Sequence, residues 1–316
     1  MKAAHTVGAG GPDMLVLVDI PLPDPLPTEV LVRVHATSIN AVDWKIRRGD
    51  FPPGALGSHP FVQGWDVAGV VESATRVTRF APGDRVHGLL WFPRQAGAYA
   101  EYVAAPALQF ALIPEHVDFI EAAARPLAGL TAWQTLHEHA HISHGSKVLI
   151  TAAAGGVGHI ATQIANALGA DVTGTATSSK HNFLRDHGVH HCIDYTTGPL
   201  ANQVTGQDVA LDLVGGDSAL DLIRTLRPGG LLIETIGLPS PAVADAAEQA
   251  GVTIVPFLVE PDGRGLDDFN TFASEHHITA HVSRTFPLAS IAAAHAAAET
   301  SHGTGKMVVT INDSAF

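Results

Sequence analysis

A turn of small residues follows a short apolar run near the middle of the chain. The run at 148–150 is partly β-branched, as in a parallel strand that is buried on both faces. Ala153, Gly155 and Gly158 then occupy the three glycine positions of the G-x-G-x-x-G pattern, with alanine at the first. From 157 onward apolar residues recur at helical spacing, so the turn precedes a helix N-terminus, where backbone amides bind phosphate. This order of elements predicts a dinucleotide-binding site.

The residues after the next expected strand, 171–176, indicate which dinucleotide binds. They are Thr177, Ser178, Ser179 and Lys180, and none of them carries a carboxylate. An acidic residue about 20 positions beyond the glycines binds the ribose hydroxyls of NAD, whereas hydroxyls and a cation accommodate a 2′-phosphate. We therefore expect NADPH rather than NADH. The alternative is that Lys180 is a solvent-facing charge at the start of a helix.

A second group of chemically active residues, at 137–141, matches H-E-x-x-H. In zinc proteases the two histidines of this pattern bind metal one helical turn apart, and the glutamate activates water. We expect a surface helix here that leads into the first strand of the nucleotide-binding domain, and neither a Met-turn nor a third ligand follows. The match is therefore interpreted as incidental, and no metal site is predicted.

Composition and charge disfavour several other classes of function. The chain has 316 residues, enough for two domains, and its net charge of -13 without a basic cluster disfavours nucleic-acid binding. No apolar run reaches the ~18 residues that a spanning helix needs, and the first ten residues lack an apolar signal core. We expect a cytoplasmic protein. Cys192 is the only cysteine, which excludes an intramolecular disulfide, and we expect it to be a small buried hydrophobe in a strand.

Several ordered motifs resemble the medium-chain dehydrogenase/reductase superfamily, most closely its zinc-independent, zeta-crystallin-like quinone oxidoreductase branch. They lie at 37–49, 64–71, 83–86, 97–102, 152–158 and 305–309. In zinc-dependent relatives a cysteine stands near Asn40 and a His-Glu pair near Trp65-Asp66. This chain has neither, and a tryptophan side chain cannot ligate zinc. The resemblance therefore implies hydride chemistry without zinc.

The expected fold is α/β. Strands that alternate with helices from 147 onward predict a parallel, Rossmann-type sheet with right-handed crossovers. The resemblance adds a β-rich, GroES-like barrel domain, with the active site in a cleft between the two. We expect the catalytic, GroES-like domain at 1–124 and 267–316, and the Rossmann NADP-binding domain at 125–266.

The resemblance also implies site residues. Asn40 and Asp43 would position the acceptor or the cofactor, although Asp43 is equally compatible with a solvated surface charge. The residues expected at the cofactor are Thr131, Ala154, Gly155, Gly156, Val157, Thr175, Ser178, Ser179, Lys180, Tyr195, Val214, Gly215, Ile236, Phe257 and Lys306. The residues expected around the substrate are Phe51, Phe61, Trp91 and Phe92.

Some of these residues have a plain structural alternative. Trp91 and Phe92 would serve equally as core aromatics. Tyr195 is also compatible with a strand-end aromatic whose hydroxyl lies in water, and Lys306 with an edge-strand charge. The conformation of the loop at 51–60, on which the shape of the substrate pocket depends, cannot be predicted from composition.

The expected reaction is hydride transfer from NADPH to a quinone or a related conjugated carbonyl. No convincing proton donor stands out, which suits a quinone, because its reduced oxygens take protons from solvent. The alternatives are an enoyl or 2-alkenal double-bond reductase, which needs an acid, and a non-catalytic, crystallin-like or regulatory NADPH-binding protein. Homodimers built by edge pairing of nucleotide-domain sheets are usual in this family, and Pro256 in the strand expected at 252–259 suits a sheet edge.

Overall fold

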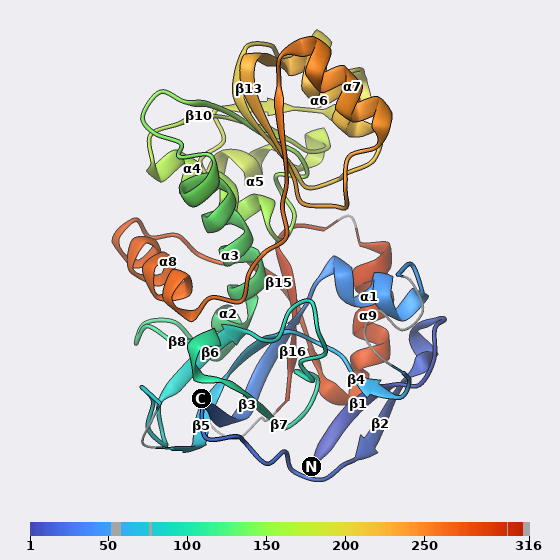
Figure 1. Cartoon of the computed structure of the whole chain (residues 1–316), viewed down its shortest axis with the longest axis vertical. Helices are drawn as coiled ribbons and strands as arrows, with labels where there is room; N and C mark the ends of the chain where they lie inside the picture. The colour runs from blue at the N-terminus through green and yellow to red at the C-terminus, as the bar shows by residue number, and fades with distance from the viewer. Residues whose placement is uncertain (52–57, 76–77, 302, 312–316) are drawn as a thin grey trace. The chain divides into compact units, whose positions relative to one another are not determined.

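The computed structural model describes residues 1–51, 58–75, 78–301 and 303–311, and the chain divides into two compact units (Figure 1). Unit 1 comprises Met1–Leu130, Glu260–Glu275 and Thr279–Phe316, and unit 2 comprises Thr131–Val259 and His276–Ile278. The chain passes from unit 1 to unit 2 after Leu130 and returns to unit 1 at Glu260, whereas the sequence predicted boundaries at 124/125 and 266/267. Two contacts explain the shift: Gly129 packs against the ring of Phe269, and the helix that carries Phe269 packs on a strand of unit 1.

Unit 2 contains a six-stranded sheet with the order β11-β10-β9-β12-β13-β14, drawn in green to orange in Figure 1. Every neighbouring pair in it is parallel. The strands are β9 (Lys147–Ile150), β10 (Asp171–Thr175), β11 (His191–Ile193), β12 (Gln207–Asp212), β13 (Leu226–Glu234) and β14 (Thr253–Pro256). The helices are α4 (Gly158–Ala167), α5 (His181–Asp186), α6 (Ser218–Thr225) and α7 (Pro241–Ala250). This is the doubly wound Rossmann topology that the sequence predicts.

Two details of unit 2 differ from the expected pattern. The strand expected at 252–259 is shorter, and the helix α7 was not expected. Helix α7 begins at a serine cap, where the backbone N–H of Val243 donates to Ser240 Oγ at 3.4 Å. It ends at Gly251, whose φ of +66° suits glycine. Pro256 does lie on an edge strand of the described sheet.

Unit 1 contains a seven-stranded sheet, ordered β15-β16-β3-β5-β6-β8 with β7 also paired to β3, and a three-stranded sheet, β2-β1-β4. Among the described strand pairs of unit 1, the β15–β16 pair is parallel and the others are antiparallel. The strands are β1 (Lys2–Thr6), β2 (Leu15–Asp19), β3 (Glu29–Ile39), β4 (Phe61–Val62), β5 (Asp66–Ala74), β6 (Arg85–Leu89), β7 (Tyr102–Pro106), β8 (Phe110–Leu112), β15 (Val282–Pro287) and β16 (Lys306–Thr310).

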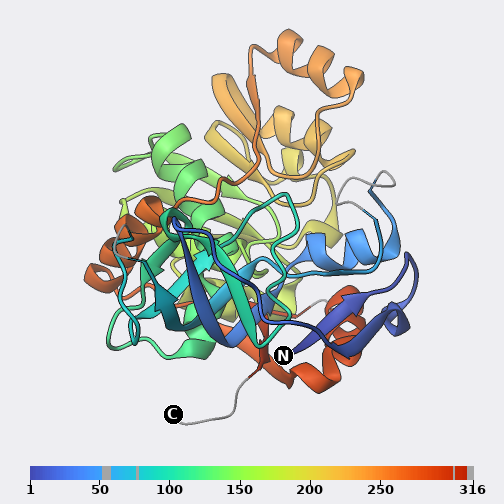
Figure 2. The same ribbon diagram turned by 60° about the horizontal axis from the view of Figure 1, so that its bottom comes forward.

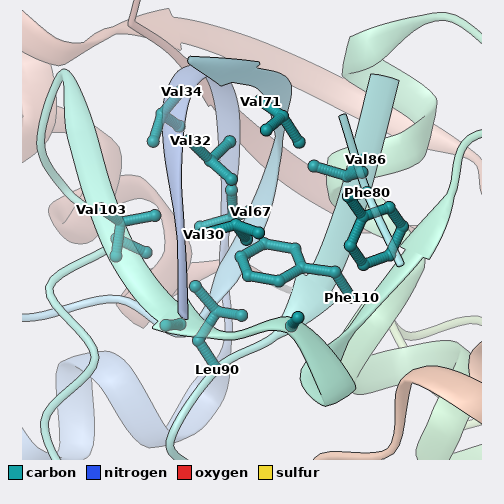
Figure 3. Packing of buried hydrophobic residues seen from close by; sticks show 13 residues of the cluster. Val30, Val32, Val34, Val67, Val71, Phe80, Val86, Leu90, Val103 and Phe110 are labelled. Atoms are coloured by element: carbon teal, nitrogen blue, oxygen red, sulfur yellow. The ribbon is translucent and has the colours of Figure 1, made fainter. Parts of the chain in front are cut away.

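Branched aliphatic side chains fill the core of the larger sheet. Figure 3 shows Val32 and Val34 of β3 grouped with Val67 of β5, Val86 of β6 and the ring of Phe110. All five are buried. The alternation of valines along 30–34 predicts this packing, because successive side chains of a strand point to opposite faces. The result is a rigid β3, whose carboxyl end carries the first candidate residue of the site.

Helices complete unit 1: α1 (Ala41–Arg48), α2 (Phe119–Ala124), α3 (Pro126–Trp133), α8 (Gly263–Glu275) and α9 (Ile291–Thr300). Helix α3 carries the chain from unit 1 into unit 2. In Figure 2 the red helix α9 lies beside the dark-blue β2, which it contacts. Between them is a second apolar core that includes Leu15, Ile291 and Val309. Helix α9 thereby packs against the start of the chain.

Candidate active site

Asn40 lies where β3 ends and α1 begins. It has an extended backbone, with φ of -112° and ψ of 158°, and it is the residue that caps α1. The carboxylate of Asp43, one turn into the helix, accepts the backbone N–H of Asn40 at 2.7 Å. This bond is one half of a capping box, so Asp43 fixes the backbone from which the Asn40 side chain projects.

The carboxamide of Asn40 is held at both of its polar atoms. Its Nδ2 donates to Asp66 Oδ2 at 2.8 Å, and its Oδ1 accepts from the ammonium of Lys306. The same ammonium donates to the carbonyl of Ile39 at 3.2 Å and lies 3.7 Å from Asp66 Oδ2. Lys306 is therefore neither a plain edge-strand charge nor a free cation, because unit 1 already uses it.

Asp66 is the centre of this group. One of its oxygens also accepts from the hydroxyl of Ser38, and the other accepts the backbone N–H of Leu127 at 2.8 Å. The residue is completely buried at the start of β5. Sequence reasoning considered Asp66 only as a position where zinc-dependent relatives have a ligand. A carboxylate inside the apolar run at 64–71 was the available signal, because a buried charge requires partners.

The surface-charge interpretation of Asp43 is wrong, since the residue is completely buried on the inner face of α1. Burial raises the pKa of its carboxyl to about 7, against the opposing effect of the Asn40 N–H. Its Oδ1 has no partner in hydrogen-bond geometry among the described residues, and the hydroxyl of Tyr99 is the polar group that faces it. That hydroxyl lies 3.2 Å from Nε2 of His295. Burial lowers the pKa of His295 to about 3, so this imidazole is neutral.

The aromatic residues expected around the substrate are dispersed within unit 1. Phe61 is buried in β4, where its ring stacks on His59 with centroids 4.9 Å apart, whereas Phe51 is exposed. Trp91 packs against the valine-rich core. Phe92 meets Trp65 edge to face at 5.5 Å. The contacts of Trp91 are those of a core aromatic, and a substrate role for these residues stays a prediction.

The glycine turn of unit 2 has the form that a pyrophosphate requires. A Cβ on Gly158 would lie 2.4 Å from the carbonyl oxygen of Ala152, so only glycine fits where α4 begins. The N–H groups of Gly156 and Val157 have no acceptor within the described ranges, and α4 has no side-chain cap. Unpaired amides at the N-terminus of a ten-residue helix fit an anionic group.

Alanine at the first glycine position has a local reason. Ala153 is buried, and a Cβ on Gly174 of the neighbouring strand would lie 2.9 Å from the Ala153 methyl group. Alanine therefore fits in the turn because the neighbouring strand has glycine, without a Cβ, at position 174. The turn keeps its close packing, because Ala153 N still donates to the carbonyl of Thr175 at 3.0 Å.

The segment expected at the adenosine ribose forms a short 3-10 turn, Ser178–Lys180. Tertiary structure brings a carboxylate to it after all: Asp194, beyond the end of β11, accepts the N–H of Ser178 at 2.8 Å. The hydrogen bonds from Thr196 and Ser178 hold the pKa of Asp194 at about 2. Sequence reasoning missed this residue, although adjacent parallel strands place their carboxyl ends at one sheet edge. Lys180 remains the cation of the segment.

Further expected cofactor residues follow the carboxyl ends of β12 and β13. Asp212 Oδ1 accepts the N–H groups of Val214 at 3.0 Å and Gly215 at 3.2 Å. Gly215 has φ of +77°, and a Cβ there would lie 2.8 Å from Ile236 Cβ. The turn at Val214 and Gly215, after β12, therefore packs directly against Ile236, after β13. Of the other expected residues, Phe257 is buried against His139, Thr131 and Thr175 are buried, and Tyr195 and Val214 are exposed.

The H-E-x-x-H pattern does not lie on a regular α-helix. Residues Gln134–His139 form a π-helix, and His141 follows with φ of +47°, outside helical geometry. The ring of His137 stacks on Trp133 at 4.1 Å. The two histidines are thus not presented one α-helical turn apart. Across the described part of the chain, no three His, Cys, Asp or Glu side chains are arranged to hold a metal ion.

Cys192 lies in β11 as expected, but it is half-buried rather than buried. Its thiol points to the carbonyl of His181 at 3.7 Å. Burial raises the pKa of this thiol, which disfavours the reactive thiolate.

Comparison with known proteins places both units. Residues 26–115 match the alcohol dehydrogenase GroES-like domain, and residues 187–309 match the family described as zinc-binding dehydrogenase. The chain is 32% identical over 313 residues to a chloroplast envelope quinone oxidoreductase homolog of Arabidopsis thaliana, covering 95% of both chains. It is 33% identical to an NADPH-dependent alkenal/one oxidoreductase of the same plant, covering 98% of this chain and 79% of the other.

Solved structures agree with the sequence relatives. The quinone oxidoreductase of Coxiella burnetii superposes with a TM-score of 0.93 at 34% identity, covering 99% of each chain. The Escherichia coli quinone oxidoreductase, solved as a complex with NADPH, gives a TM-score of 0.88 at 27% identity, covering 98% of this chain and 100% of that one. The two units define an oxidoreductase with a Rossmann sheet and a GroES-like sheet. The chain belongs to the quinone oxidoreductase branch of the medium-chain dehydrogenase/reductase superfamily.

Proposed function

We propose that this enzyme transfers hydride from NADPH to a quinone or a related conjugated carbonyl, and that it does so without zinc. The observation that carries the proposal is the Asn40 carboxamide, which Lys306 and Asp66 hold by its Oδ1 and one Nδ2–H. An amide held in this way keeps one N–H to donate, and a carbonyl oxygen accepts such a donor. The names of the relatives, quinone oxidoreductase in Arabidopsis and Coxiella, agree with this substrate class.

The nicotinamide ring of NADPH supplies the hydride, and the residues of the chain bind and orient the reactants. The amides of Gly156 and Val157 suit the pyrophosphate, and Thr177, Ser179 and Lys180 suit the 2′-phosphate. The turns at Val214 and Gly215 and at Ile236 are proposed to lie at the nicotinamide. A relative named as NADPH-dependent, and the E. coli complex with NADPH, support the choice of cofactor.

Zinc independence follows from how the side chains are used. At the positions where zinc-dependent relatives carry ligands, this chain has Asn40, Trp65 and Asp66. Asp66 already accepts from Ser38, Asn40 and Leu127. The ammonium of Lys306 lies 3.7 Å from it, and this positive charge disfavours a second cation at the same place.

Proton supply favours a quinone over an enone. A quinone that accepts hydride becomes a hydroquinone anion, and its oxygen is protonated from solvent. An enone needs a proton on carbon, and the two carboxyl groups bonded to Asn40, those of Asp43 and Asp66, are both enclosed. Reduction of an enone or 2-alkenal is the second candidate, because one relative is named an alkenal/one oxidoreductase.

Oxidation of NADPH, followed by its absorbance on EDTA-treated protein, tests the proposal against quinones and enones in parallel, with NADH as the comparison. Turnover of quinones with NADPH, unchanged by the chelator, is expected. Loss of activity on chelation would contradict zinc independence, and faster turnover of enones would favour the second candidate. Tight binding of NADPH without oxidation by any acceptor would favour a non-catalytic, crystallin-like or regulatory role.

The assembly and the location belong to the same proposal. We propose a homodimer formed through β14, because this edge strand pairs only with β13 among the described strands. A single-monomer mass at all concentrations in light scattering would contradict it. We propose a cytoplasmic enzyme, to be tested by cell fractionation. No helix in the described ranges is both long and apolar enough to cross a membrane.

A further inference from the structure

Three oxygen atoms of unit 1 surround the ammonium of Lys306, two from consecutive residues at the end of β3 and one from β5. They are Oδ1 of Asn40, the carbonyl oxygen of Ile39 at 3.2 Å, and Oδ2 of Asp66 at 3.7 Å. The lysine side chain is 3% exposed and that of Asp66 is 0% exposed. The ammonium donates hydrogen bonds to the first two oxygens and forms an ion pair with Asp66 Oδ2, so unit 1 itself holds this cation.

This arrangement decides which way the Asn40 carboxamide faces. A carboxamide turned by half a rotation has nearly the same shape, with a donor and an acceptor exchanged. Here Lys306 can only donate, and Asp66 Oδ2 already accepts from the hydroxyl of Ser38. The turned form would therefore place the Asn40 NH2 group against the Lys306 donors and its oxygen against the Asp66 acceptor. The pair thus permits one orientation only. In it, one N–H of Nδ2 binds Asp66, and the second has no acceptor among the described residues.

We propose that Lys306 and Asp66 are positioning residues, which orient Asn40 so that its second Nδ2–H donates to the carbonyl oxygen of the substrate. The inference rests on the proposed function, since it assigns the Asn40 donor a carbonyl partner. It goes beyond that function by giving the lysine an indirect role in place of the expected contact with the cofactor. The two charges also cancel, so the donor is held in the core of unit 1 without a net charge from this pair.

The double variant Lys306→Met/Asp66→Asn tests the inference, because it removes both charges together and leaves no unpaired buried ion. With Lys306 absent, and an amide at 66 that can donate as well as accept, Asn40 is free to turn. We expect kcat/KM for a simple quinone to fall about 10- to 100-fold, as for the loss of one well-placed hydrogen bond. The Kd for NADPH, measured by fluorescence titration, is expected to change less than about twofold.

The same double change made on Asn40→Ala separates positioning from a general structural effect. With no carboxamide left to orient, we expect no further fall in kcat/KM beyond that of Asn40→Ala alone. An equal fall with and without Asn40 would overturn the inference. So would a large loss of NADPH affinity with unchanged acceptor kinetics, because that would make Lys306 a direct cofactor ligand. If Asn40→Ala itself were silent, the role of Asn40 in the proposed function would fail instead.

Chemical rescue supplies a second readout. Lys306→Ala leaves room for a small cation among the three oxygens, so methylammonium chloride is expected to restore part of the lost activity, whereas Lys306→Met leaves no such room. Rescue of neither variant, together with unchanged folding by circular dichroism, would count against the ammonium as the orienting group. Lys2→Met/Asp19→Asn is the matched control, since this exposed Lys–Asp pair of the same unit lies 3.4 Å apart. It is expected to leave the kinetics unchanged.

Discussion

The Nε2 atom of His295, on α9, lies 3.2 Å from the hydroxyl oxygen of Tyr99 inside unit 1. The two rings meet edge to face with centroids 5.5 Å apart. On its other side the Tyr99 hydroxyl faces Asp43, so one phenol separates an imidazole whose pKa is lowered from a carboxyl whose pKa is raised. An ionised Asp43 beside it favours the orientation in which the Tyr99 O–H faces the carboxylate and the Tyr99 oxygen accepts from His295.

The pH dependence of stability tests the burial of Asp43. The pKa of its carboxyl is about 7 in the folded protein and 3.8 for an unperturbed aspartate, so the folded state binds more protons between these pH values. Asp43 therefore contributes stability that is full below about pH 4 and is lost as the pH rises through about 7. In Asp43→Asn this loss is absent. Urea unfolding at pH 5, 6, 7 and 8 should show the variant gaining stability relative to wild type as the pH rises, by ~3 kcal/mol over this range.

The neighbouring groups set the control for this experiment. Asp66, Lys306, Tyr99, His295 and Arg47 all face the Asp43 region and remain in both proteins. His295 acts in the opposite direction, because its lowered pKa makes stability fall as the pH drops from 6.5 toward 3. Only the difference between variant and wild type isolates Asp43. A constant difference across this pH range would contradict the raised pKa.

Removal of the Tyr99 hydroxyl should affect both of its neighbours. In Tyr99→Phe, His295 loses its Nε2 partner and Asp43 loses the polar group that lowers its pKa. We expect a loss of about 1–3 kcal/mol in the free energy of unfolding. We also expect the pH at which Asp43 titrates to move upward. Tyr102→Phe, at a half-buried tyrosine of β7, is the control and should cost less than about 0.5 kcal/mol. Equal effects of the two changes would refute a special role for the Tyr99 hydroxyl.

The glycine turn predicts a combined effect on stability and cofactor binding. The Cβ of Gly158→Ala would lie 2.4 Å from Ala152 O and 2.7 Å from Ala153 Cα, which forces the turn apart. We expect unfolding to become easier by about 1–3 kcal/mol and the Kd for NADPH to rise at least about tenfold. Calorimetry measures both. Gly8→Ala is the control, since its Cβ would meet only Met14 Sδ at 3.5 Å. Unchanged NADPH binding by Gly158→Ala would exclude this turn as the pyrophosphate site.

Lys180 should determine the preference for NADPH. In Lys180→Ala we expect the Kd for NADPH to rise about tenfold and the Kd for NADH to stay the same, since only NADPH has the 2′-phosphate. Lys147→Ala, at an exposed lysine of the same unit, should change neither value. An equal rise in the Kd for NADPH and for NADH would mean that Lys180 attracts both cofactors by its charge and does not bind the 2′-phosphate. Unchanged binding of both would leave it as a surface charge.

Local patterns predicted the Rossmann unit well. The buried run at β9, the glycines of the turn and the helical spacing of α4 are neighbours in sequence, so their geometry depends on short-range rules. Motif spacing likewise predicted the family, which the relatives confirm. The exact ends of strands and the presence of α1 and α7 were missed. Both helices begin at a polar capping residue, Asn40 for α1 and Ser240 for α7.

The chemical state of the site depended on contacts between distant residues. Lys306 and Asn40 are 266 positions apart, and Asp194 reaches Ser178 across 16. Sequence alone identified Asn40, Asp43 and Lys306 as residues of interest. It did not show that Asp43 is enclosed or that the lysine is already paired. The sequence by itself thus determined the Rossmann topology and the position of the glycine turn, because both follow from local spacing. Only tertiary structure decided which polar atoms are used, because burial and hydrogen-bond partners depend on where distant segments meet.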